Sequence, residues 1–137
     1  GCACTMNSIL KQFIKHLTVE ENEVVLLDME AGVEHFGRGV DNSVDLILMI
    51  VDPSFESLKL TKKIQQLGES IGKTVFFVLN KVNGQILPTM LESIDDQSKV
   101  LAVISEDTEI ARKGLLGNEL MMEIPEIHTL AREILKQ

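Results

Sequence analysis

The fold class of this chain follows from residues 46–53, LILMIVDP. Six apolar residues are stopped by an aspartate and a proline, and a strand that is apolar on both faces is typical of a parallel sheet covered by helices. Similar apolar runs occur at 24–27, where the run ends in Asp28, and at 75–79 and 100–104. The sequence therefore predicts four buried, mostly parallel strands.

Segments with helical periodicity alternate with these runs. Apolar residues at spacings of three and four predict helices near 7–17, 54–68, 86–94 and 107–116, and from Pro125 to the end. Strands that alternate with helices indicate an α/β fold, a three-layer αβα sandwich with a mostly parallel sheet. We expect all 137 residues to form a single domain.

The composition excludes several classes of protein. Lys and Arg number 13 against 21 Asp and Glu, a net charge of −8, so we expect no nucleic-acid partner, because such binding needs a basic footprint. The longest apolar run, 46–51, is too short to span a bilayer. The polar face of the last helix carries mixed charge, which favours packing against the core over binding to a membrane. Without a recognisable signal peptide, we expect a cytoplasmic protein.

The ends of the apolar runs hold the candidate nucleotide site, because ligands of open α/β sheets bind beyond the carboxyl ends of the strands. Asp28 ends its run in the manner of a Walker B carboxylate, which acts on a hydrated magnesium ion. Gly32 follows four residues later, where a glycine amide can approach a γ-phosphate. The alternative for Asp28 is a helix or turn cap, which is a common use of aspartate at a strand end.

Asn80 and Lys81 follow the run at 75–79. A side-chain amide at this place can both donate to and accept from the edge of a purine, while the lysine stem can lie over the ring. The alternative is a simple asparagine turn. Because Asp28 and Asn80 occur in the expected order along alternating strands and helices, the two signals support each other as parts of one nucleotide site.

Cys2 and Cys4 are the two cysteines of the chain. Two thiolates one residue apart can reach one soft metal ion, but they supply only half of a tetrahedral shell. Two copies of the chain across a two-fold axis would supply all four sulfurs. Thiolates suit nickel, zinc and copper(I) alike, and free loop cysteines are the alternative.

Three segments together resemble one protein family. They are residues 2–7 (CACTMN), 25–39 (VLLDMEAGVEHFGRG) and 79–82 (LNKV). They are similar to the carbon monoxide dehydrogenase accessory ATPases of the CooC type, which belong with the MinD/ParA ATPases and the nitrogenase iron protein among the P-loop ATPases. The resemblance covers nearly the whole chain, and residues 28–39 are its most specific part.

The resemblance implies a homodimeric ATPase that uses ATP and magnesium and helps to insert nickel into carbon monoxide dehydrogenase or a related nickel enzyme. In this family a Cys-x-Cys pair from each subunit binds nickel or zinc between the protomers, which assigns the metal to Cys2 and Cys4. The resemblance also makes Asp28 and Gly32 the switch-II elements, Asp28 being the catalytic candidate. It makes Asn80 the adenine contact, with Lys81 beside it.

The chain departs from this family in one respect. Neither a phosphate loop of the form Gly-x-x-x-x-Gly-Lys-Ser/Thr, nor its deviant form, nor the switch-I aspartate occurs in the 137 residues. Phosphoryl transfer depends on positioning and charge neutralisation, so we expect no ATP hydrolysis by this chain alone and weak or absent nucleotide affinity. We expect the carboxy-terminal portion of a P-loop ATPase domain, without the P-loop strand that normally lies centrally in the sheet.

Two other functions stay open. The first is a non-catalytic metal-binding or protein-interaction domain that kept the ATPase fold without the nucleotide site. The second is an iron–sulfur reductase component like the nitrogenase iron protein. The cysteines of that protein lie far apart in its sequence, so the Cys-x-Cys spacing argues against this possibility.

Overall fold

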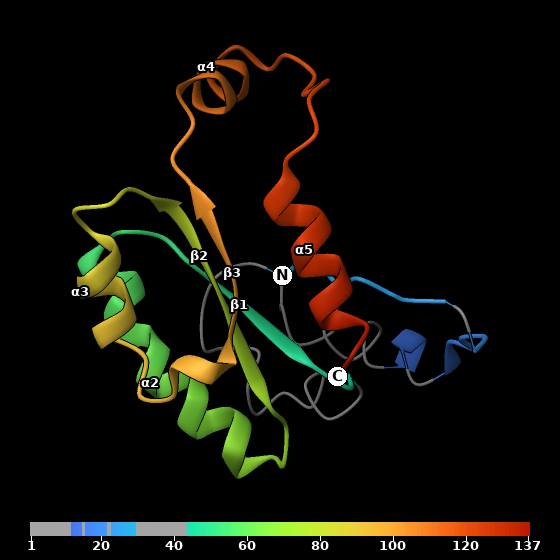
Figure 1. Ribbon diagram of the computed structural model, residues 1–137. Helices are drawn as coiled ribbons and strands as arrows, with labels where there is room; N and C mark the ends of the chain where they lie inside the picture. The colour runs from blue at the N-terminus through green and yellow to red at the C-terminus, as the bar shows by residue number, and fades with distance from the viewer. Residues whose placement is uncertain (1–11, 15, 22, 30–43) are drawn as a thin grey trace, which may run out of the picture.

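A parallel sheet forms the centre of the structure, a computed structural model that describes residues 12–14, 16–21, 23–29 and 44–137. Within these residues three strands are hydrogen-bonded in the order β1-β2-β3, and both neighbouring pairs are parallel (Figure 1). The strands are β1 (Ile47–Val51), β2 (Val75–Val82) and β3 (Val100–Ser105). They confirm the apolar runs at 46–51, 75–79 and 100–104 as strands.

Helices cover both faces of this sheet. Figure 1 shows α2 and α3 on one face, α5 on the other, and α4 projecting beyond the carboxyl end of β3. Their bounds are α2 (Phe55–Ser70), α3 (Leu87–Glu92), α4 (Thr108–Leu116) and α5 (Pro125–Ile134), with a short 3-10 helix, η2 (Gln97–Lys99), before β3. The three-layer αβα arrangement is therefore confirmed. None of the helices in the described ranges is both long and apolar enough to cross a membrane.

The helix α2 begins and ends where local chemistry dictates. The hydroxyl of its N-cap residue Ser54 accepts a hydrogen bond from the backbone N–H of Ser57 at 3.2 Å. Its buried residues Thr61, Ile64 and Gly68 recur at spacings of three and four, which places them on the face toward the sheet. Gly72 follows the helix with φ +69°, a left-handed conformation that glycine adopts without a steric penalty.

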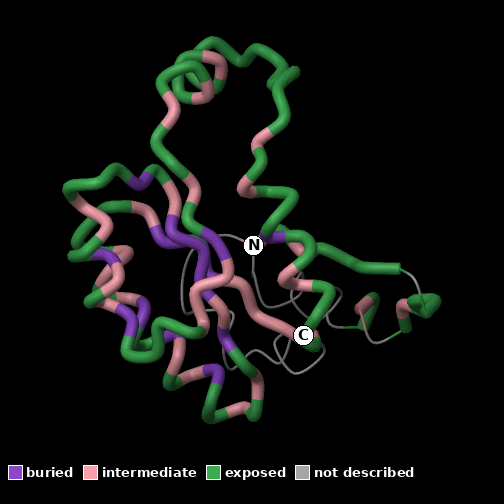
Figure 2. Tube along the Cα trace, viewed as in Figure 1, coloured by how far each residue is buried: buried purple, intermediate pink, exposed green. Residues whose placement is uncertain are grey.

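Two clusters of buried side chains lie on opposite faces of the sheet. On the face of α2 and α3, Phe77 and Leu79 of β2 are fully buried and pack with Met90 of α3. On the other face, Val78 packs with Leu130 of α5. Successive side chains of a strand point to opposite faces, which explains why neighbours in β2 belong to different clusters. Figure 2 shows the buried residues concentrated along the strands.

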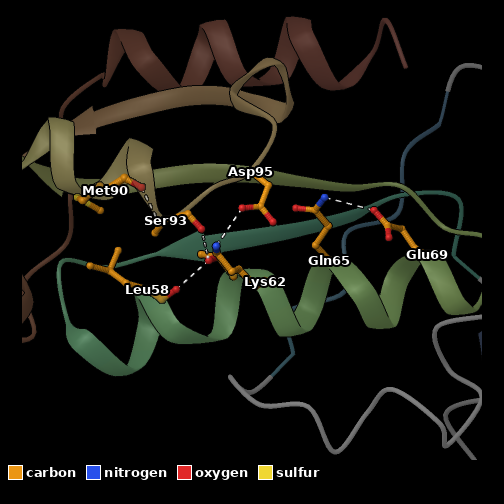
Figure 3. Close-up of polar contacts among 8 residues, drawn as sticks. Leu58, Lys62, Gln65, Glu69, Met90, Ser93 and Asp95 are labelled. Atoms are coloured by element: carbon orange, nitrogen blue, oxygen red, sulfur yellow. Dashed lines mark hydrogen bonds and ion pairs between the residues drawn. The ribbon is translucent and has the colours of Figure 1, made fainter.

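A buried hydroxyl fastens α3 to α2. Thr61 is 1% exposed, and its Oγ1 lies 2.7 Å from the carbonyl oxygen of Ser93 and 2.8 Å from that of Leu58 (Figure 3). Nearby, the Nζ of Lys62 lies 3.1 Å from a carboxylate oxygen of Asp95, with both side chains well exposed. Exposed ion pairs of this kind contribute little to stability, so the hydrogen bond from the buried hydroxyl of Thr61 is the stronger link between the two helices.

The predicted strand at 24–27 is wrong. Residues 23–29 form no strand, and Val24, Val25 and Leu26 are 57%, 46% and 82% exposed. A strand needs a neighbouring strand for its backbone hydrogen bonds, and an apolar strand also needs cover on its faces. Among the described residues β1 pairs with β2 alone, and no strand is available beside the run at 24–27. Of the predicted first helix, residues 12–14 and 16 are helical, Leu17 is not, and residues 7–11 and 15 lie outside the described residues.

Candidate functional site

The carboxyl ends of the three strands meet at one edge of the sheet. In the parallel ladder Val51 of β1 lies opposite Leu79 of β2, so the next residues, Asp52 and Asn80, emerge side by side. This edge is where open α/β sheets bind their ligands. The register thus brings together two polar side chains that are 28 positions apart in the sequence.

One carboxylate engages both members of the predicted base-binding pair. Asp52 accepts a hydrogen bond from the Nδ2 of Asn80 at 2.9 Å, on its Oδ1, and another from the Nζ of Lys81 at 2.7 Å, on its Oδ2. The side chains of Lys81 and Asp52 are 60% and 42% exposed, so this ion pair adds little to stability. The backbone N–H of Asp52 donates to the Oγ of Ser57 at 3.1 Å, which fixes the start of the loop after β1.

Lys81 has an unusual backbone for its residue type. Its φ is +54°, the one positive φ of a residue other than glycine within the described ranges. The β2–β3 register shifts between Leu79 and Val82, so Asn80 and Lys81 lie in a bulge. Bulges and left-handed residues of this kind are enriched beside functional sites, because they turn side chains toward a ligand. The role of Asn80 and Lys81 in binding a base stays a prediction.

The end of β3 completes the edge. The backbone N–H of Glu106 donates to the carbonyl oxygen of Val82 at 2.9 Å, and the Nδ2 of Asn83 lies 3.5 Å from a carboxylate oxygen of Glu106. Asp107 is the N-cap of α4, where it accepts hydrogen bonds from the backbone N–H groups of Glu109 and Ile110 at 2.7 and 3.0 Å. Asp107 is thus occupied as a helix cap, whereas Glu106 faces the loop after β2.

The remaining predicted site residues are not brought to this edge by the described structure. Asp28 is exposed in the irregular segment 23–29, and no hydrogen bond or ion pair joins it to Asn80 or Lys81. Gly32, Cys2 and Cys4 lie outside the described residues. Within the part of the chain that the structure describes, no three His, Cys, Asp or Glu side chains gather in a group that could hold a metal ion. The roles of these four residues stay predictions.

Reasoning from the sequence places Asp52 at the end of a strand but assigns it no role in the site. The signal was present, since Asp52 follows its apolar run in the same way as Asn80 follows the run of β2. Both residues occupy the ligand-binding end of neighbouring strands, but their hydrogen bond depends on the register between β1 and β2. A sequence does not reveal that register.

The amino-acid sequence of the chain is similar to those of several known proteins. The chain is 45% identical over 136 residues to an uncharacterized ATP-binding protein of Methanocaldococcus jannaschii, covering 99% of this chain and 54% of that protein. It is 33% identical over 118 residues to the carbon monoxide dehydrogenase accessory protein CooC of Rhodospirillum rubrum, covering 85% of this chain and 45% of that protein. The resemblance to the CooC-type ATPases is therefore confirmed. No family model matches the chain.

The chain spans about half the length of the curated relatives that it matches. A second ATP-binding protein of Methanocaldococcus jannaschii is 32% identical over 126 residues and is covered to 49%. The relatives are thus ATP-binding proteins and one accessory protein. The chain is therefore similar to about half of each of these proteins.

A solved structure shows the same fold. The MinD cell division protein of Aquifex aeolicus matches with a TM-score of 0.60 and 15% sequence identity, covering 77% of this chain and 50% of that protein. At this level of identity the match concerns the fold alone. The MinD-like, P-loop NTPase-like fold class expected from the sequence is confirmed.

Proposed function

We propose that this chain is the carboxy-terminal, base-recognising and metal-binding portion of an ATP-dependent accessory protein for nickel insertion into carbon monoxide dehydrogenase. The observation that carries the proposal is the pair Asn80 and Lys81, turned out by a bulge at the ligand-binding end of a MinD-like sheet. The 33% identity to the CooC accessory protein supports the client assignment. In this proposal the whole chain is one domain.

The base side of the proposed nucleotide site fits the residues that are present. Asn80 offers an amide at the sheet edge, and the Lys81 stem extends from the adjacent position with its Nζ held by Asp52. An amide recognises a purine edge by hydrogen bonds, and a lysine stem can cover the ring. We assign Asp28 to the magnesium ion and Gly32 to the γ-phosphate, roles that follow from their motif alone.

The phosphate side of that site is missing from this sequence, which has no phosphate loop. Binding of the triphosphate therefore rests on the base contact and a few switch residues. We expect no measurable ATP hydrolysis by this chain alone, as tested by release of inorganic phosphate. Turnover that persists in an Asp28→Asn variant would show that the catalytic assignment is incorrect.

Nickel is the proposed cargo, and Cys2 and Cys4 are its proposed ligands. Each chain supplies two thiolates, so a four-thiolate site requires a homodimer with one metal ion per two chains. Calorimetric titration with nickel or zinc should give a stoichiometry near one metal per two chains, and sedimentation should show dimers that depend on the metal. A variant with serine at both positions should lose both effects. Undiminished stoichiometric binding by that variant would refute the proposed site.

A second candidate function is a metal-binding or interaction domain without catalysis. The two functions differ in one measurable respect. An accessory ATPase segment should show signal changes at Asn80 and Lys81 when an adenine nucleoside is added, whereas a domain without the nucleotide site should show none. Nuclear magnetic resonance titration of the labelled chain separates them.

A further inference from the structure

The hydrogen bond between Asp52 and Asn80 has a direction that chemistry fixes. An ionised carboxylate can only accept hydrogen bonds, whereas an amide carries a donating NH₂ on one side and an accepting oxygen on the other. Asn80 must therefore turn its Nδ2 toward Asp52, and the 2.9 Å contact between Nδ2 and Oδ1 agrees. The Oδ1 of Asn80 consequently points away from Asp52, and no described residue donates to it.

The second oxygen of the carboxylate is also occupied. The Nζ of Lys81 donates to the Oδ2 of Asp52 at 2.7 Å, so donors from two consecutive residues of β2 hold both oxygens. The backbone N–H of Asp52 is tied to Ser57 as well. A carboxylate fixed at both oxygens and at its own backbone cannot rotate freely, so it holds the amide of Asn80 in one orientation.

We propose that Asp52 is a positioning residue that makes Asn80 a hydrogen-bond acceptor toward the ligand and thereby selects a purine with an amino group over one with a carbonyl oxygen. Adenine and hypoxanthine differ at position six, where adenine carries an amino donor and hypoxanthine an oxygen acceptor. The amino group of adenine satisfies the Oδ1 of Asn80, whereas the oxygen of hypoxanthine meets a second acceptor. Mispaired polar groups cost binding affinity.

This inference rests on the proposed base contact of Asn80 and adds the residue that determines its selectivity. The adenine preference in this scheme comes from β1, through a residue that does not touch the base. Loss of the Asp52 carboxylate frees the amide to rotate by half a turn. Asn80 can then offer either its donor or its acceptor to the base, and the preference disappears.

The test is a titration of the full, ¹⁵N-labelled chain with adenosine and with inosine at millimolar concentrations, followed by nuclear magnetic resonance. In the wild type we expect the Asn80 side-chain amide to shift and adenosine to bind about fivefold more tightly than inosine, a difference of about 1 kcal/mol. In Asp52→Ala the ratio should fall below about twofold. Asp52→Asn should give an intermediate ratio, because its amide oxygen can accept from Asn80 but can also turn away.

A second readout reports the orientation without a ligand. A side-chain amide proton that is bonded to a carboxylate resonates downfield of its partner, so the separation between the two Asn80 amide protons should shrink in Asp52→Ala. Asp95→Ala is the matched control. Asp95 is also an exposed aspartate paired with a lysine, but its partner is Lys62, so this variant should keep the wild-type ratio and the wild-type separation.

The outcomes distinguish a failure of the positioning role of Asp52 from a failure of the base contact of Asn80. An adenosine preference that persists in Asp52→Ala would overturn the positioning role while leaving the base contact intact. An absence of any shift at Asn80 in the wild type would overturn the base contact itself, and the selectivity with it. If Asp52→Ala loses its signal dispersion and is unfolded, Asp52→Asn decides, and an unchanged ratio in that variant refutes the inference.

Discussion

The close approach of α2 to β2 at Gly68 provides the sharpest test of the fold. A Cβ added to Gly68 would lie 2.4 Å from the Cγ2 of Val75 and 3.0 Å from the carbonyl oxygen of Lys73. Val75 is 2% exposed and β-branched, so its side chain has little freedom to move. The backbone is also fixed, because the N–H of Lys73 donates to the carbonyl oxygen of Gly68 at 2.9 Å.

These contacts set the expected magnitude for Gly68→Ala. Alanine in a helix interior is favoured over glycine by about 1 kcal/mol. Overpacking of a buried site costs about 1–3 kcal/mol, and a 2.4 Å contact belongs at the upper end of that range. The net expectation is a loss of about 1–2 kcal/mol in the free energy of unfolding. Urea unfolding followed by far-ultraviolet circular dichroism measures it, since the chain has no Trp or Tyr.

Gly114 offers a matched control in another helix. It lies inside α4, and a Cβ added there meets nothing within 4 Å. Gly114→Ala should therefore stabilise the protein by about 0.5–1 kcal/mol, the opposite sign to Gly68→Ala. In a double mutant, Val75→Ala should relieve part of the cost of Gly68→Ala, giving a favourable coupling energy. A Gly68→Ala variant as stable as the wild type would refute the packing of α2 on β2 described above.

Three further predictions concern polar groups and the site. Thr61→Val should destabilise the protein by about 1–2 kcal/mol, because it removes the buried hydroxyl that donates to the carbonyl oxygen of Ser93, while Thr129→Val at an exposed position of α5 should change little in the same urea assay. Lys81→Gly should stabilise the fold by about 1 kcal/mol, since it relieves the left-handed backbone and loses only an exposed ion pair; equal or lower stability would contradict the assigned strain. Hydrogen bonds from the hydroxyl and the backbone N–H of Ser98 lower the pKa of Asp96, so the stability that they contribute is present above the ordinary aspartate pKa and is lost as the pH falls through the lowered value. A carboxyl carbon titration should show that pKa rising in Ser98→Ala.

The type and the approximate ends of most helices and strands were predictable from the sequence, because they depend on residues that are neighbours in the chain. Ser54 and Gly72 bound α2, and the uniformly apolar strands need only a sheet covered on both faces. Asn80 and Lys81 were identified as candidates because they follow such a strand. These inferences required a pattern of residue types and no knowledge of which strands are neighbours.

The exceptions depend on contacts between distant segments. The run at 24–27 is as apolar as a buried strand, yet it forms none here, because no neighbouring strand is available to it among the described residues. The opposite happens at Asp52, an unremarkable residue of a turn until the β1–β2 register sets it beside Asn80. The sequence by itself determined the kinds of element and the residues at their ends. The tertiary structure alone decided which ends meet, because the hydrogen bonds between strands, and not the composition of any one strand, set their order and register.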